Sequence, residues 1–175
     1  CYLTSRRRTL RSERKQKRAV RRLLRTMRAQ VRRSMADPRS HVILRSILAQ
    51  DPAPLPVSIF KSLKNRVRYH REDPHVVASV PILYGDPCKG GGVGDCNDFA
   101  VAVAALGLMG RYQARWAIGL DAAGEPVHIW TQLRQPGGEW IDVDPTPGAP
   151  EPGHGSPVDI PGAQVVGWTA VHVRR

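Results

Sequence analysis

Apolar residues in the first third of the chain recur at steps of three and four, which is the spacing of one face of a helix. This periodicity predicts a long helix over residues 6–35 and a short one over residues 40–49. Asp37 and Pro38 are expected to separate them, because proline disfavours helical geometry in the residue before it. The same pattern predicts a third helix over residues 57–69. The apolar face of the first helix consists of Val20, Leu23, Leu24, Met27, Val31 and Met35.

A buried helix is predicted in the middle of the chain, where residues 99–109 are almost continuously apolar. Asp95 is suited to cap its N-terminus, and Asp98 places a negative charge in its first turn, where the helix dipole favours one. Gly110 is a natural end for this helix. The segment before it, residues 70–94, is rich in Gly and Pro and is expected to be irregular.

Strands are predicted in the C-terminal half from alternating residues, with Gly-containing turns at 121–125 and 136–138 as hairpin connections. The segment 145–162 is rich in Pro and Gly and is expected to be an extended surface loop. Helices followed by an antiparallel sheet predict an α+β fold. The four expected strands cover residues 112–120, 126–134, 139–144 and 165–173.

Positive charge is concentrated at one end of this chain of net charge +12. Residues 1–39 hold 15 Arg and Lys against two acidic residues, a balance of +13, whereas residues 40–175 hold 12 basic and 13 acidic residues. Several prolines make residues 51–56 a stiff linker. We therefore predict a basic helical arm over residues 1–50, a linker over residues 51–56 and a folded domain over residues 57–175.

The charge density of the arm fits electrostatic binding to the phosphates of DNA or RNA. Tyr2 is its only aromatic residue, so base stacking is not expected and contacts would be independent of sequence. Docking on an acidic protein surface is the alternative. The apolar face of the arm needs cover from the domain, a second copy or another chain. The predicted polyanion-binding residues are Arg6, Arg7, Arg8, Arg11, Arg14, Lys15, Lys17, Arg18, Arg21, Arg22, Arg25, Arg28, Arg32 and Arg33.

Other classes of protein fit the sequence poorly. The three cysteines, Cys1, Cys88 and Cys96, are too few for a disulfide framework and favour a reducing compartment. No cysteine pair has zinc-finger spacing and there is no HExxH motif, so neither a metal site nor a cofactor is expected. No apolar run approaches the ~20 residues of a membrane span, and no apolar region typical of a secretory signal follows the charged N-terminus.

Cys96 follows a Gly-rich loop and begins the predicted buried helix. Unpaired N–H groups at a helix N-terminus favour the thiolate, which is the nucleophilic form of cysteine. The backbone N–H of Cys96 would also point toward an oxyanion formed at an attacked carbonyl. The alternative is a buried structural cysteine. Cys88 is either an ordinary loop cysteine or the partner of Cys96 in a regulatory disulfide.

His128 lies within a predicted strand and could take a proton from Cys96 and deliver it to a leaving amine. A core histidine bonded to backbone is the alternative. Asp144 ends the next predicted strand, where antiparallel pairing can bring it beside the imidazole as the orienting acid. Asp142 faces the same way and competes for this role, and both could instead cap a turn before Pro145.

The motifs around these residues resemble those of the transglutaminase-like superfamily. Residues 94–100 (GDCNDFA), 128–130 (HIW) and 140–146 (WIDVDPT) resemble its three catalytic motifs in order and spacing. Residues 110–115 resemble its strand after the helix, and the likeness extends over residues 57–146. The resemblance implies a papain-like fold, with the nucleophile at a helix N-terminus packed on an antiparallel sheet.

The same resemblance implies that Cys96 is the nucleophile, His128 the base and Asp144 the orienting acid. The approach to the cysteine is most similar to small transglutaminase-like proteins of tailed phages and prophages, which implies a place in the host cytoplasm or the virion.

Three hypotheses for function follow. The first is a cysteine enzyme that attacks an amide or peptide carbonyl of a polypeptide or amide substrate and passes the acyl group to water or an amine. The second is a virion structural or morphogenesis protein with little or no turnover, whose arm binds DNA or neighbouring virion subunits. The third is a nucleic-acid binder with an incidental domain. No membrane partner is expected.

Overall fold

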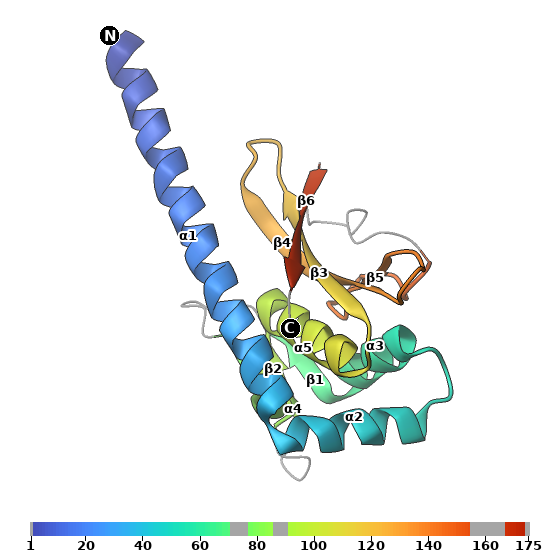
Figure 1. Ribbon diagram of the computed structural model, residues 1–175. Helices are drawn as coiled ribbons and strands as arrows, with labels where there is room; N and C mark the ends of the chain where they lie inside the picture. Colours follow the sequence, from blue (N-terminus) through green and yellow to red (C-terminus); the bar gives the residue numbers. More distant parts are fainter. Residues whose placement is uncertain (1, 71–76, 86–90, 155–166, 174–175) are drawn as a thin grey trace.

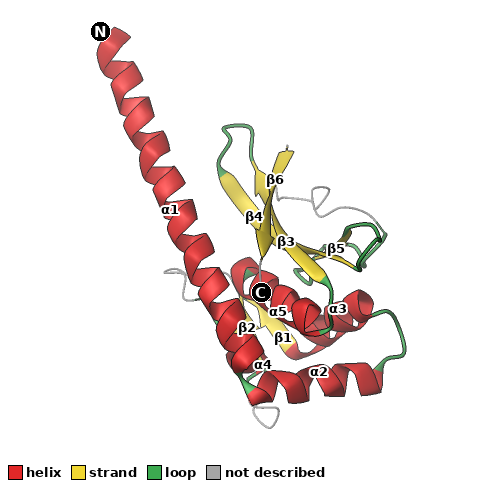
Figure 2. Ribbon diagram, in the orientation of Figure 1, coloured by secondary structure: helices red, strands yellow, loops and turns green. Residues whose placement is uncertain are grey.

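The computed structural model describes residues 2–70, 77–85, 91–154 and 167–173 of the chain. Helices dominate its first half and strands its second half (Figure 2). The helices are α1 (Tyr2–Ala36), α2 (Pro38–Gln50), α3 (Leu55–Arg66), α4 (Val80–Tyr84) and α5 (Cys96–Met109). The strands are β1 (Val67–Tyr69), β2 (Gly92–Gly94), β3 (Gln113–Leu120), β4 (Pro126–Arg134), β5 (Ile141–Val143) and β6 (Gly167–Val173).

A four-stranded antiparallel sheet with the order β5-β4-β3-β6 packs against α5 (Figure 1). Two side chains of the sheet bind the same carbonyl of that helix: Trp116 donates from Nε1 to the oxygen of Ala100 at 3.2 Å, and Thr131 donates from Oγ1 at 2.7 Å. The prediction of an α+β fold with a helix on an antiparallel sheet is therefore confirmed.

Helix α5 is apolar on all sides because it is enclosed on all sides. The sheet covers one side, and α1, α3 and α4 contact the others. Its residues Ala100 to Leu106 are all buried. A helix of this kind is stable only inside a core, so the continuous apolar run predicted its burial correctly.

The apolar face of α1 is covered by the domain itself. Met27 and Val31 are fully buried in the same core cluster as α5, with Leu24 nearly so. Leu44 and Ile47 of α2 join that cluster. The division at residues 51–56 stays a prediction, but the helices before it share one core with the helix that begins at Cys96.

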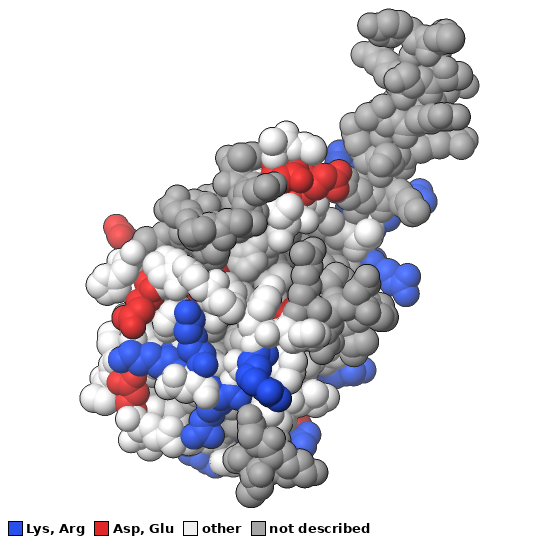
Figure 3. Space-filling view, turned by 180° about the vertical axis from the view of Figure 1, so that it is seen from behind, with Lys and Arg blue, Asp and Glu red and all other residues white. Residues whose placement is uncertain are grey.

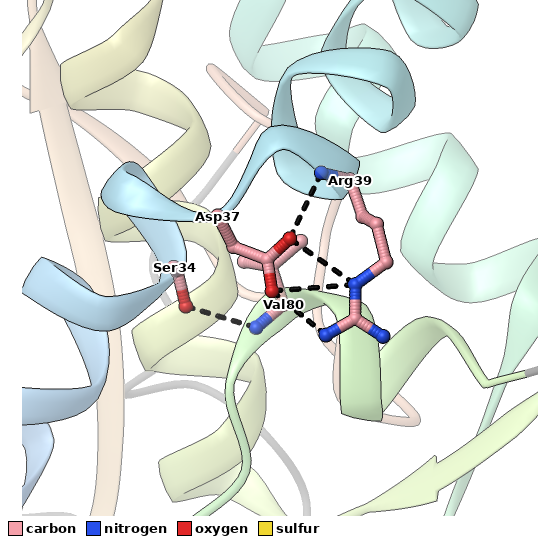
Figure 4. Close-up of polar contacts among 4 residues, drawn as sticks. All are labelled: Ser34, Asp37, Arg39 and Val80. Atoms are coloured by element: carbon pink, nitrogen blue, oxygen red, sulfur yellow. Dashed lines mark hydrogen bonds and ion pairs between the residues drawn. The ribbon is translucent and has the colours of Figure 1, made fainter.

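The corner between α1 and α2 is fixed by two polar contacts (Figure 4). Asp37 caps α2 by accepting the backbone N–H of Arg39 at 2.9 Å, and it pairs with the guanidinium of the same residue at 2.8 Å. Ser34, fully buried at the end of α1, accepts the backbone N–H of Val80 at 2.9 Å. The second contact ties α1 to α4, which lies 46 positions later in the chain.

Two features of the approach to α5 differ from the prediction. Residues 67–69 were expected to continue a helix, but they form β1, which pairs in parallel with β2. Residues 70–94 were expected to be irregular, yet they contain α4 and β2. A strand of three residues has too few positions to establish a period, so only its long-range partner identifies it.

The expected surface loop over residues 145–162 lies partly outside the described residues. Its first residues, Pro145 and Thr146, are buried rather than exposed. They are held there because Thr146 donates from both its backbone N–H and its Oγ1 to Oδ1 of Asp144.

Candidate active site

Cys96 is the first residue of α5, as the sequence predicted. Asp95 caps the helix by accepting the backbone N–H of Asn97 at 2.8 Å and that of Asp98 at 3.4 Å. Asp98 completes the capping box, because its Oδ2 accepts the backbone N–H of Asp95 at 2.9 Å. This reciprocal capping box fixes the backbone on both sides of Cys96.

The capping box leaves one amide of the first turn open. Asp95 occupies the N–H groups of Asn97 and Asp98. Among the described residues, no acceptor binds the backbone N–H of Cys96 itself. A backbone N–H left open at the residue that carries the half-buried sulfur is available as a donor to an oxyanion.

The segments that precede Cys96 pack closely against α4 and the start of α5. Oδ1 of Asp98 accepts the backbone N–H of Ala78 at 2.6 Å, which ties the helix start to the segment before α4. A Cβ atom at Gly92 would lie 1.6 Å from the carbonyl oxygen of Leu83, so only glycine fits this strand against α4. The glycine-rich run therefore allows a close backbone approach that positions the cysteine.

His128 and Asp144 meet beside this helix start. Nε2 of His128 lies 2.6 Å from Oδ2 of Asp144, and both side chains are largely shielded from solvent, at 10% and 2% exposure. Thr146 occupies the other carboxylate oxygen with two hydrogen bonds. Asp144 thus accepts the hydrogen bonds of a turn and also contacts the imidazole, while its role as orienting acid stays a prediction.

Cys96 is close enough to His128 to contribute to the shift of its pKa. Nε2 of His128 faces Asp144, so Nδ1 is the ring nitrogen that Asp144 does not contact. Burial alone would lower the pKa of His128, but the hydrogen bonds and negative charges of Asp144 and Cys96 outweigh it and raise the pKa to about 10. At neutral pH the imidazole is therefore protonated between a carboxylate and a sulfur.

Asp142, the competing acid, is engaged elsewhere. Its Oδ1 accepts the indole N–H of Trp130 at 2.5 Å and the amide of Gln132 at 2.7 Å. Trp130 in turn stacks on His128, with ring centroids 5.8 Å apart and planes 20° from parallel. Asp142 therefore contacts the site through Trp130 rather than through the imidazole.

Trp130 is a core residue that also contacts His128. The side chain is indeed buried, at 1% exposure, but its flat face orients the ring of His128 and its N–H binds Asp142. The signal was present in the sequence, because residues two apart on a strand share a face.

The remaining predicted features are placed as follows. Cys1 and Cys88 lie outside the described residues, and so does any disulfide between Cys88 and Cys96. In the described segments, no three His, Cys, Asp or Glu side chains come together as a metal site. None of the helices in the part of the chain that the structure describes has the length and apolar content of a membrane span.

Comparison with known proteins gives one match. The family model described as the transglutaminase-like superfamily matches residues 43–145, which include Cys96, His128 and Asp144. No curated protein and no solved structure matches the chain. The closer resemblance to phage proteins therefore stays a prediction.

Proposed function

Because this chain belongs to the transglutaminase-like superfamily, we propose that it is a cysteine-dependent acyl-transfer enzyme acting on an amide or peptide carbonyl. Cys96 is the nucleophile, His128 the proton carrier and Asp144 the orienting acid. The observation that carries the proposal is the contact of 2.6 Å between Nε2 of His128 and the buried carboxylate of Asp144, close to Cys96 at the start of α5.

The first half of the reaction uses the sulfur of Cys96 and the protonated imidazole of His128. The sulfur of Cys96 attacks the carbonyl carbon, and the C=O π electrons move to oxygen to form a tetrahedral oxyanion. The open backbone N–H of Cys96 stabilises that charge. When the C–N bond breaks, Nδ1 of His128 gives its proton to the leaving amine, and a thioester to Cys96 remains.

The second half reverses the proton flow. Neutral His128 removes a proton from water or from an incoming amine, which attacks the thioester and releases the acyl group. Asp144 stabilises the imidazolium that forms again, and because Thr146 fixes its second oxygen it holds one orientation throughout. Water as acceptor gives hydrolysis, and an amine gives transamidation.

The proposal is tested by trapping the acyl-enzyme in a Cys1→Ser, Cys88→Ser background, where Cys96 is the only thiol. The protein is incubated with small activated esters, and the adduct is located by mass spectrometry of its peptides. We expect an acyl adduct on Cys96 that decays in water and decays faster when a primary amine is added.

The matched control is His128→Gln in the same background. It keeps the thiol but removes the proton carrier, and we expect acylation to slow by about 10²-fold or more. Equal acylation rates in the two proteins would reject the catalytic pair. That result would favour the alternative inferred from the sequence, a virion structural or morphogenesis protein that retains the fold without turnover.

We further propose that α1 binds a polyanion such as DNA or RNA. Its apolar face packs into the domain, whereas most of its described basic side chains point to solvent. Figure 3 displays them as a row of blue side chains along one edge of the molecule. The described basic residues are Lys17, Arg18, Arg21, Arg22, Arg25, Arg28, Arg32 and Arg33, of which Arg28 is half-buried.

Deleting residues 1–39 is a poor test of this proposal, because it would remove the buried Met27 and Val31. Replacing the exposed Arg21, Arg22 and Arg25 by Gln removes charge and leaves the core intact. We expect this variant to elute from heparin at lower salt than the parent protein. Unchanged elution would contradict binding through this face, and docking on an acidic protein surface would remain.

A further inference from the structure

Positive charge also converges at the opposite end of α5 from Cys96. A pocket of about 810 Å³ opens there, lined by the side chains of Arg111, Arg134 and His172 and by apolar residues that include Leu108, Pro136 and Val173. None of the described residues that line it is acidic. Since residues 40–175 carry a net charge of −1, this concentration of cations is local.

Arg111 lines this pocket although its backbone has a conformation that residues other than glycine rarely adopt. Its φ is 68°, in the left-handed region, where it closes α5 with hydrogen bonds from Arg111 to Leu108 at 3.1 Å and from Tyr112 to Gly107 at 2.9 Å. Glycine is the usual residue at this position of a helix end. Gly110 precedes Arg111 but has an ordinary φ of −78°. The strained left-handed conformation is therefore adopted by the arginine and not by the glycine.

Arg134 and His172 are held in place by Trp140. The guanidinium of Arg134 lies 4.5 Å from the centre of the indole ring, and His172 meets its edge at 5.8 Å. Nε and Nη2 of Arg134 both donate to Oε1 of Gln113. Within the described residues, Nη1 of Arg134 has no acceptor.

Arg115 is a further positively charged side chain close to Arg134. Arg115 packs on Trp140, with its guanidinium 4.3 Å from the ring centre. Burial lowers the pKa of Arg115, the charge of Asp142 opposes that shift, and the smaller effect of Arg134 adds to it. Arg115 also donates from Nε to Oε1 of Gln132 at 2.6 Å and does not line the pocket itself.

We propose that this pocket binds the phosphate group of an organic phosphate. Two guanidinium groups and an imidazole match the charge and the acceptor oxygens of a phosphate near its dianionic form. The apolar wall of Leu108, Pro136 and Val173 accommodates the organic part, and the volume suits a ligand of nucleotide size. With a rise of ~1.5 Å per residue over α5, the pocket lies about 20 Å from Cys96 and is separate from the candidate active site.

The test is binding of inorganic phosphate, AMP and adenosine to the full chain at constant ionic strength, by calorimetry and thermal unfolding. We expect phosphate and AMP to bind and to raise the melting temperature, and adenosine to do neither. Tighter binding of AMP than of phosphate assigns an organic phosphate as the ligand, and equal binding assigns free phosphate to the same site.

The decisive variant is Arg111→Gly, because relief of backbone strain should raise stability whereas loss of the guanidinium should lower affinity for phosphate. Glycine relieves the left-handed backbone, so the unliganded protein should melt at a higher temperature, while affinity for phosphate should fall at least tenfold. Arg134→Gln should lower affinity without that gain in stability.

Arg45→Ala on α2 removes one exposed charge outside the pocket and should leave affinity unchanged. The proposal fails if Arg111→Gly retains full affinity. It also fails if Arg45→Ala weakens binding as much, or if phosphate has no more effect than chloride at equal ionic strength.

Discussion

His128 Nε2 lies 2.6 Å from Oδ2 of Asp144, while the nearby carboxylate of Asp142 accepts from Trp130 and Gln132 instead. The two acids are only two residues apart in the sequence, yet they contact different partners. The imidazolium is thus stabilised by one carboxylate, and the second fixes the aromatic ring that stacks on it.

Because Asp144 and Asp142 contact different partners, removing the charge of each should affect the acylation rate differently. Asp144→Asn should slow acylation of Cys96 by about 10²-fold or more, because the imidazolium loses its buried counter-charge. Asp142→Asn is the matched control, since its amide oxygen can still accept from Trp130 and Gln132. Its rate should stay within about threefold of the parent. An equal loss in both variants would contradict the separate roles, and a larger loss in Asp142→Asn would identify Asp142 as the orienting acid. The measurement is the rate of ester acylation in the single-thiol background.

Stability should depend on pH through His128. Its pKa is raised in the folded protein to about 10, from an ordinary value of 6.5. A group with a raised folded pKa contributes stability that is fully present below its unfolded pKa and is lost as pH rises through the folded value. The stability advantage of the parent over His128→Gln should therefore shrink between pH ~6.5 and ~10. Urea unfolding of both proteins under reducing conditions measures it, and an advantage that grows with pH would contradict the assigned ion pair.

Ser34→Ala should destabilise the corner between α1 and α4. The hydroxyl is fully buried and accepts the backbone N–H of Val80, so its loss leaves a buried donor unpaired. We expect a decrease of about 1–3 kcal/mol in the free energy of unfolding. Ser46→Ala, which removes the hydroxyl that accepts from Gln50 in an exposed contact, should change it by less than ~0.5 kcal/mol. Similar losses in the two variants would indicate that the contact with Val80 is not the cause.

Gly92→Ala should disturb the approach to Cys96. The added methyl group would meet the backbone of Leu83, which cannot move without displacing α4, so we expect a loss of about 1–3 kcal/mol or more. Acylation of Cys96 should slow as well, because β2 leads directly into α5. Gly138→Ala is the control, since a Cβ there is 3.5 Å from its nearest neighbour. Wild-type stability in Gly92→Ala would show that this strand can shift.

Much of the fold could be predicted because its signals are local. The cap by Asp95, the end of the first helix before Pro38 and the hairpin between β3 and β4 each depend on residues a few positions apart. The α+β class follows from the order of these elements. In the candidate site, the motif around Cys96 and the alternation of β4 indicated Cys96 and His128 before any coordinates.

The sequence by itself determined the long helices and the strands of the antiparallel sheet, which face of α1 is apolar and which residue types are available for acyl transfer. Only the tertiary structure decided that Asp144 rather than Asp142 binds His128, that α1 is covered by α5, and that Arg111 and His172 share a pocket. The physical reason is that periodicity and capping act within one or two turns of chain. Choices between neighbouring acids, and the cover of an apolar face, depend instead on groups that only packing brings together.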